Sequence, residues 1–252
     1  MLAIERRREI LARLSVSGKV IVSDLAKDFD VTEETIRRDL EKLDREGLAS
    51  KTYGGAVSKH ASAIDLPYNV REIVNVEQKQ IIADKICDII HDGDRIMADS
   101  SSTALYIIKK IKEKENLTII TNSVKILLEL AEKSDWTVLS TGGVLKKGAL
   151  SLTGSSAEKM ISSYHVDIAI CSCKGLDMSL GVTDSNENDS QIKQAMLACA
   201  EKRILALDSE KFDKKSFVKV CDPTSIDVLV TDSEPTEKWV SFCNENNIEL
   251  IY

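Results

Sequence analysis

Small polar side chains stand where three apolar segments of the sequence end. Asp99 closes the first segment and precedes the hydroxyl run 100–103, Thr121 closes the second, and the Thr-Gly-Gly run 141–143 follows the third. Free backbone N–H groups at the start of a helix favour phosphate, hydroxyls add donors, and glycine permits close backbone approach. One such loop alone is more simply explained as a helix cap. Three together predict a single anion-binding pocket.

Charged residues further along the chain extend this set. Lys174 follows a fourth apolar segment, Lys193 lies in a helical stretch, and Lys211 comes shortly after Asp208. A lysine beside a phosphate loop offsets ligand charge as a point cation, although a single lysine is more often a solvated surface residue. The predicted ligand-binding residues are Asp99, Ser101, Ser102, Thr103, Thr121, Asn122, Ser123, Gly142, Gly143, Lys174, Glu187, Lys193 and Lys211.

The elements that must position these residues alternate regularly from residue 76 onward. Continuous apolar strands separated by helices are typical of a parallel sheet covered on both faces, and such sheets bind ligands at the carboxyl ends of their strands. We therefore expect a Rossmann-like α/β domain over residues 76–252, preceded by an aperiodic linker over 58–75. The expected strands are 95–99, 117–121, 136–141, 166–171, 203–208, 226–231 and 248–251, and the expected helices include 102–112, 123–133, 188–201 and 235–246.

Residues 1–57 predict a small head made mainly of helices. An amphipathic helix over 4–17 stops at Gly18, Ser23 is placed to cap a second helix, and Thr32 is placed to cap a third that ends near Gly47. The stretch after the third helix resembles two short strands of a wing. The residues expected to face inward from the third helix are Ile36, Leu40 and Leu43.

Two short capped helices joined by a tight turn match the helix-turn-helix plan, whose second helix enters the major groove of DNA. A plain three-helix packing module would show the helices, but not a basic third helix and a wing in this order. Base contacts specify sequence, arginine pairing bidentately with guanine, whereas phosphate contacts only position the protein. The residues expected at base edges are Thr32, Glu34, Thr35 and Arg38, those at phosphates Arg37 and Lys42, and those on the wing Lys51 and Tyr53, with Ser23 completing the DNA-binding set. Double-stranded DNA is the predicted partner.

Composition limits the class of protein. The 252 residues are 43% hydrophobic and 30% charged, as in soluble globular proteins, and we expect no transmembrane segment, no signal peptide and a cytoplasmic location. The net charge is −7, but residues 1–60 alone carry +1, and DNA binding depends on a local basic face. Six scattered cysteines and three isolated histidines predict no metal site, cofactor or catalytic set. Cys171 and Cys173 share one face of a strand; a thiophilic metal is the alternative to their role as buried fillers.

The stretch 22–56, VSDLAKDFDVTEETIRRDLEKLDREGLASKTYGGA, resembles the DNA-binding signature of the DeoR family of repressors. The resemblance implies operator binding, usually within an oligomer. Residues 76–232 resemble the sensor domain of that family, whose fold is similar to ribose-5-phosphate isomerase, and this implies a phosphosugar effector. The chain departs from many relatives at Ser101, where they have glycine, and at the turn 173–175. The positions that match the family motifs are Asp99, Ser102, Thr103, Thr121, Asn122, Ser123, Gly142, Lys193 and Lys211.

Three functions are compatible with this sequence. The leading one is a sequence-specific repressor of a carbohydrate operon that responds to a sugar phosphate and has no enzymatic activity. The alternative is a sugar-phosphate isomerase with a DNA-binding appendage, for which Asp99, Glu187 and Lys211 supply suitable residue types. The third is an interaction module whose sheet domain only dimerises, which leaves the three polar strand ends without a purpose.

Overall fold

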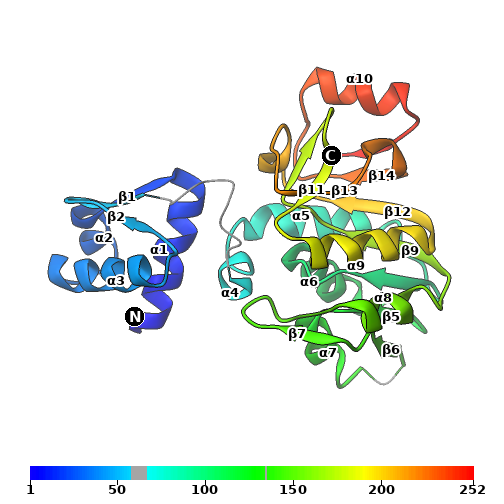
Figure 1. The fold of residues 1–252 in the computed structure, drawn as a ribbon, viewed down its shortest axis with the longest axis horizontal. Coiled ribbons are helices and arrows are strands. Elements are labelled where there is room, and N and C mark those ends of the chain that lie inside the picture. Colours follow the sequence, from blue (N-terminus) through cyan, green and yellow to red (C-terminus); the bar gives the residue numbers. More distant parts are fainter. Residues whose placement is uncertain (58–66, 134) are drawn as a thin grey trace. The chain divides into compact units, whose positions relative to one another are not determined.

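The computed structural model describes residues 1–57, 67–133 and 135–252, and these form two compact units, Met1–Val74 and Asn75–Tyr252 (Figure 1). The first unit is a winged helix-turn-helix head, and the second is an α/β domain built on a parallel sheet. The predicted fold class is therefore confirmed. Part of the expected linker, residues 58–66, lies outside the described residues.

The head consists of three helices, a small antiparallel sheet of order β1-β3-β2, and one further helical turn. Its buried core includes the predicted inward face of the third helix, because Ile36, Leu40 and Leu43 are all at most 1% exposed. Gly55 is required at the sheet, since a Cβ there would lie 1.9 Å from the Val20 carbonyl oxygen. The elements are α1 (Ala3–Ser17), β1 (Lys19–Ile21), α2 (Val22–Asp28), α3 (Glu33–Arg45), β2 (Ser50–Lys51), β3 (Gly55–Val57) and α4 (Tyr68–Arg71).

The prediction that Ser23 caps the second helix is wrong. Helix α2 begins one residue earlier, at Val22, and its N-cap is Ile21, which makes no side-chain cap hydrogen bond. The pairing of β1 with β3 brings Gly54 close to the start of α2. The Val22 amide donates to the Gly54 carbonyl oxygen at 2.9 Å. The wing thus satisfies the first amide of a helix that begins one residue before Ser23. Ser23 lies inside this helix, and its hydroxyl donates to the Asp24 carboxylate instead.

A buried ion pair ties α1 to α3. Asp39 is 4% exposed and accepts from Arg6 Nε at 2.5 Å and from Arg7 Nη1 at 3.3 Å. A buried carboxylate is stable only when paired and hydrogen-bonded. The sequence pattern does not predict this contact, because it joins residues 33 positions apart.

The end of the expected linker packs on the head. Val70 in α4 is 1% exposed and belongs to the same apolar cluster as Ile10 and Leu40, with Val74 against its margin. The first unit therefore extends to Val74.

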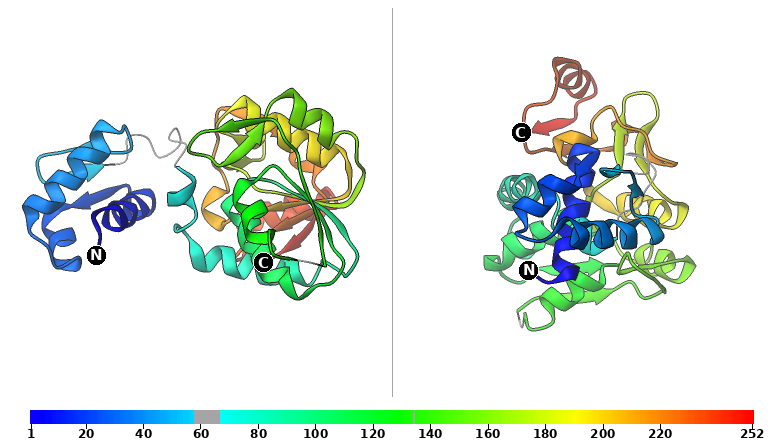
Figure 2. Two further views of the ribbon diagram at one scale, coloured as in Figure 1. Left: turned by 90° about the horizontal axis from the view of Figure 1, so that it is seen from below. Right: turned by 90° about the vertical axis from the view of Figure 1, so that its left-hand side faces the viewer.

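The second unit contains a seven-stranded parallel sheet of order β15-β14-β12-β9-β4-β5-β6. Helices α5, α6 and α7 lie on one face and α8 and α9 on the other (Figure 2). Two small antiparallel sheets, β7-β8 and β10-β11-β13, were not predicted. The elements are α5 (Val76–Cys87), β4 (Arg95–Ala98), α6 (Ser102–Lys110), η1 (Ile111–Glu113), β5 (Thr118–Thr121), α7 (Val124–Leu130), β6 (Thr137–Ser140), β7 (Val144–Lys146), β8 (Ser151–Thr153), α8 (Ser155–Ile161), β9 (Val166–Cys171), β10 (Gly175–Asp177), β11 (Gly181–Asp184), α9 (Glu187–Ala198), β12 (Ala200–Ala206), η2 (Ser209–Lys211), β13 (Val218–Cys221), η3 (Pro223–Ser225), β14 (Val228–Val230), α10 (Glu237–Glu245) and β15 (Glu249–Ile251).

The strand order creates a crevice between β4 and β9. The chain runs outward from β4 through β5 to β6, then returns to pair β9 on the other side of β4 and runs outward again through β12, β14 and β15. Loops that leave β4 and β9 therefore go to opposite faces of the sheet, and open α/β sheets bind ligands at such a point.

Candidate functional site

Asp99 occupies the crevice at the carboxyl end of β4. Asp99 is only 1% exposed. Its carboxylate accepts hydrogen bonds from the backbone N–H groups of Ser101 at 3.0 Å and of Ser172 at 3.1 Å. Ser101 begins the loop that enters α6, and Ser172 follows β9. One carboxylate therefore holds together the loops on the two sides of the crevice.

Lys193 brings a positive charge to Asp99 from helix α9. Its ammonium lies 3.5 Å from Asp99 Oδ2 and donates to Asp184 at the end of β11, and the Lys193, Asp99 and Asp184 side chains are 9%, 1% and 3% exposed. Burial alone would lower the pKa of Lys193, but the carboxylates of Asp184 and Asp99 outweigh it and raise that pKa. Burial likewise opposes the ionisation of Asp184, yet the Lys193 ammonium keeps the pKa of Asp184 below its ordinary value. Lys193 is thus a buried, charged lysine and not a solvated surface one.

Lys211 approaches the same loops from η2. Its ammonium lies 3.2 Å from Asp208 and donates to Ser172 Oγ at 3.3 Å. Burial would raise the pKa of Asp208, but Lys211 and, more weakly, Lys79 hold that pKa below its usual value. Three of the predicted residues, Asp99, Lys193 and Lys211, therefore converge on one cluster, to which the structure adds Asp184, Asp208 and Ser172.

The hydroxyl loops are used largely within the fold. Ser101 Oγ accepts from the Ala104 amide at 3.0 Å and caps α6, and Ser123 Oγ accepts from the Ile126 amide at 3.3 Å and caps α7. Thr121 Oγ1 donates to the Ala98 carbonyl at 2.7 Å, which joins the ends of β4 and β5. The capping interpretation therefore holds for both serines. Ser102 and Thr103 form the first turn of α6 and are 5% and 1% exposed.

Asn122 and Ser151 present buried polar atoms at the end of β5. Asn122 Nδ2 donates to the Leu152 carbonyl at 3.0 Å, so the β7–β8 hairpin lies against this loop. Among the described residues, Asn122 Oδ1 and Ser151 Oγ are buried and have no hydrogen-bond partner. Such atoms cost free energy unless a water or ligand satisfies them. Ser151 was not predicted, because its strand is too short to show a period.

The other predicted ligand-binding residues lie less centrally. Glu187 is exposed and accepts from Gln191 Nε2 at 3.1 Å, and Lys174 is half-buried, its backbone N–H donating to Thr183. Gly142 and Gly143 are exposed with φ of 61° and 102°. A Cβ at Gly143 would lie 2.6 Å from the Thr153 carbonyl oxygen, so the hairpin requires glycine there.

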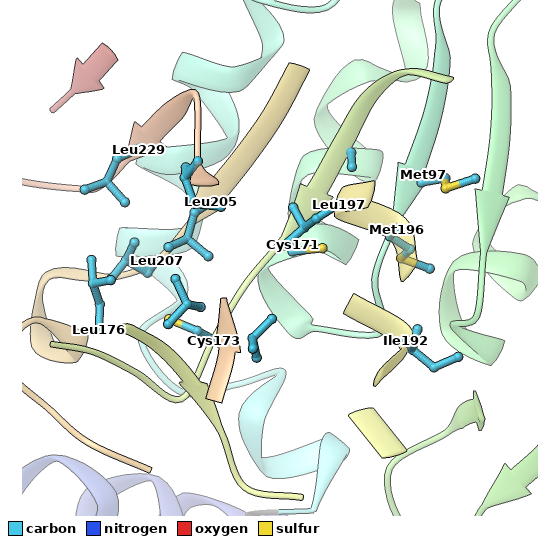
Figure 3. Close-up of a cluster of buried hydrophobic side chains, with 14 of the residues drawn as sticks. Met97, Cys171, Cys173, Leu176, Ile192, Met196, Leu197, Leu205, Leu207 and Leu229 are labelled. Atoms are coloured by element: carbon cyan, nitrogen blue, oxygen red, sulfur yellow. The ribbon is translucent and has the colours of Figure 1, made fainter. Parts of the chain in front are cut away.

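Cys171 and Cys173 pack in an apolar cluster with Met196, Leu205 and Leu207 (Figure 3). Burial raises the pKa of the Cys171 thiol well above its usual range and that of Cys173 to about 12. Both thiols are therefore protonated at neutral pH and act as small apolar side chains. Within residues 1–57, 67–133 and 135–252, no three His, Cys, Asp or Glu side chains form a group that could hold a metal ion.

Helix α3 presents the candidate DNA-binding side chains. Thr32 caps it as predicted, its hydroxyl accepting from the Thr35 amide at 3.3 Å. Arg38 is exposed and lies 3.2 Å from Glu34 one turn earlier. Exposed pairs of this kind are worth little, so Arg38 can exchange Glu34 for a DNA acceptor at small cost.

The remaining candidates of this set are also on the surface of the head. Arg37 pairs with Glu33 at 2.8 Å, Lys42 and Lys51 are exposed, and Tyr53 is fully exposed between β2 and β3. Ser23 lies half-buried in the first turn of α2. No described helix combines the length and apolar character needed to cross a membrane.

Comparisons with known proteins agree with this architecture. Residues 74–233 match the family model described as the DeoR C terminal sensor domain, and residues 6–62 match the DeoR-like helix-turn-helix domain. An uncharacterized HTH-type transcriptional regulator of Bacillus subtilis (strain 168), YulB, is 40% identical over 92% of this chain and 90% of its own length. The L-fucose operon activator of Haemophilus influenzae is 31% identical over 96% of this chain and 97% of its own length.

A likeness among solved structures is to ribose 5-phosphate isomerase A from Methanocaldococcus jannaschii, at 17% identity and a TM-score of 0.40, covering 56% of each chain. Together the two family models account for the head and for most of the parallel-sheet unit. The relatives that match along nearly the whole length are transcriptional regulators. The chain belongs to the DeoR family and is a transcriptional regulator, not an enzyme.

Proposed function

We propose that this regulator is a repressor whose affinity for its operator is set by a sugar phosphate bound at the carboxyl ends of β4 and β9. The observation that carries the proposal is the position of Asp99, which is bonded to the loops on both sides of the crevice and to Lys193. A ligand at this point contacts segments from both halves of the sheet, and it can therefore favour one arrangement of them.

The groups around the crevice suit the two ends of a sugar phosphate. The first turn of α6, with Ser102 and Thr103, offers backbone N–H groups and hydroxyls for a phosphate, and the helix dipole favours that charge. Lys211 and Asp208 offer a donor and an acceptor for sugar hydroxyls. Asn122 Oδ1, which is buried with no partner among the described residues, is a further acceptor.

The head supplies operator recognition in this proposal. Arg38, with Thr32, Glu34 and Thr35, reads base edges from the start of α3, and Lys42 contacts phosphate. The regulator acts in the cytoplasm as a homo-oligomer, since two-fold sites of helix-turn-helix proteins are read by paired heads.

Selection of binding sites from random duplex DNA, followed by footprinting at fixed salt, tests operator recognition. Arg38→Ala should relax the base preference at one position, whereas Lys42→Ala should weaken all sites evenly and reduce the salt dependence. An Arg38→Ala variant with unchanged preference, or a wild-type protein that selects no sequence, contradicts this part of the proposal.

Titration with sugar phosphates tests the effector. Calorimetric titration with ribose 5-phosphate, fructose 1-phosphate, fructose 6-phosphate and glucose 6-phosphate should give binding by at least one compound, which also shifts operator affinity. Lys211→Met should weaken that binding, while Lys238→Met, an exposed lysine on α10, is the matched control. Binding that is unaffected by Lys211→Met would place the ligand elsewhere.

A further inference from the structure

The first residue of the α/β unit, Asn75, adopts an uncommon conformation. It is the N-cap of α5, yet its backbone is left-handed, with φ 51° and ψ 46°, and its side chain makes no cap hydrogen bond. An N-cap residue is ordinarily extended, and asparagine is among the best capping residues, because its side-chain oxygen accepts a first-turn amide. Asn75 thus forgoes the bond that its position favours.

The side chain of Asn75 is used instead by the segment that carries Lys211. Asn75 Nδ2 donates to Glu210 Oε2 at 3.2 Å. Glu210 lies in η2 between Asp208 and Lys211, and Lys211 reaches Ser172 Oγ in the crevice. A shift of η2 therefore acts directly on the Asn75 side chain.

Asn75 also stands next to a residue that is fixed to the other unit. Val74 packs against the apolar cluster of the head and is the last residue of that unit. A left-handed and an extended backbone at Asn75 differ by more than 100° in φ. The two conformations therefore direct the chain that leads to Val74 differently.

We infer that Asn75 is a two-state positioning residue: in one state its bond to Glu210 holds it left-handed, and in the other, which a ligand in the crevice favours by shifting η2, it is released to cap α5. This inference rests on the proposed function, because it assigns to the effector the step by which its binding reaches the head. The Asn75 side-chain oxygen accepts from a first-turn amide of α5 only in the released state. The switch has two discrete states, as transmission between sites requires.

Two variants push the switch in the same direction. Asn75→Asp removes the donor, places a carboxylate beside Glu210 and still caps well, and Glu210→Ala removes the acceptor. Without any sugar phosphate, both should move the operator affinity about 3- to 10-fold towards the effector-saturated value, the range expected for one hydrogen bond. Asn75→Gly removes the hydrogen bond to Glu210 but still permits the left-handed backbone, so it should change the operator affinity less than the other two variants do. Asn247→Asp and Glu245→Ala are matched controls, because Asn247 is also left-handed (φ 55°) and Glu245 is exposed on α10.

Linkage supplies a readout that mere damage would not produce. A variant that favours the released state must bind the effector more tightly, by the same factor by which its operator response shrinks. Hydrogen exchange should also show the first-turn amides of α5 protected in Asn75→Asp.

The inference is overturned if Asn75→Asp and Glu210→Ala bind operator like the wild type, or if they bind the sugar phosphate more weakly. Operator affinity without ligand tests the switch whether or not any sugar phosphate in the panel binds. A panel that fails to bind the wild-type protein overturns the proposed effector instead, and leaves the operator affinities of the variants to decide the switch.

Discussion

Replacing Lys193 with methionine measures how far the buried charge cluster stabilises the α/β unit. Methionine retains most of the side-chain length but removes the ammonium, so Asp99 and Asp184 lose their shared counter-ion. Because those two side chains are 1% and 3% exposed, water cannot replace the lost ammonium as their partner. Removing one partner of a buried ion pair costs about 3–5 kcal/mol, because the remaining charge is left uncompensated.

This cost converts into a large change in melting temperature. For a unit of this size, 1 kcal/mol corresponds to about 2–4 °C in Tm, so Lys193→Met should lower Tm by about 6–20 °C at pH 7.5 in differential scanning calorimetry. Lys159→Met, at an exposed lysine on α8, is the matched control and should change the free energy of unfolding by no more than about 0.5 kcal/mol.

The pH dependence separates electrostatics from packing. In the wild type, burial would raise the pKa of Asp184, but Lys193 lowers it, so its ionisation contributes stability that is lost as the pH falls through the folded-state pKa. Without the ammonium, the burial that raises the pKa of Asp184 is opposed by the Ser185 amide and Lys174 but no longer by Lys193. The pKa of Asp184 should therefore be higher than in the wild type, and the variant should lose less stability when this carboxyl takes up a proton. The Tm difference from wild type should therefore be smaller at pH 5 than at pH 7.5. Equal Tm differences at both pH values, or a decrease in Tm of less than about 2 °C at pH 7.5, would refute the electrostatic account.

Three further changes test other parts of the structure. Asp39→Ala leaves Arg6 buried without its partner and should lower the free energy of unfolding of the head by about 3–5 kcal/mol in urea titrations; a loss below about 1 kcal/mol would contradict the buried-pair assignment. Thr32→Ala should cost about 1 kcal/mol by removing the cap of α3 while Thr32→Ser retains it, and equal stability of the two variants would argue against the cap. Because burial raises the pKa of Cys173 to about 12, its thiol should react with a disulfide reagent at pH 8 only as fast as the protein opens; rapid labelling of the native protein would disprove its burial as a neutral thiol.

Local spacing was sufficient for some caps and failed where a distant segment intervenes. Thr32 was predicted correctly because its hydroxyl acts on an amide three residues away. Ser23 also carries a hydroxyl and was expected in the same role, but α2 begins one residue earlier, where its first amide donates to the Gly54 carbonyl. That contact depends on the pairing of β1 with β3, which periodicity does not encode.

The same distinction applies to the candidate site. The position of Asp99 at a strand end was readable, because an apolar run gives way to polar residues there. The burial of Lys193 was not readable, since its ammonium is charged and is stabilised mainly by Asp184 and Asp99, which lie on other elements. Ser151 and Asp39 gave no signal, because each acquires its importance from a contact across the fold.

Strand order is what turns these separate residues into one site. In chain order β4 is followed by β5, and β9 comes 68 residues after the end of β4, yet β9 pairs with β4 in parallel. This pairing places the Ser172 amide within reach of Asp99 and sends α6 and α9 to opposite faces of the sheet. A ligand that inserts there must displace or join bonds from both halves, including the one that Lys211 makes to Ser172. Since Lys211 is the neighbour of Glu210, any such displacement begins one residue from the contact that holds Asn75, and η2 therefore connects the crevice to the start of α5.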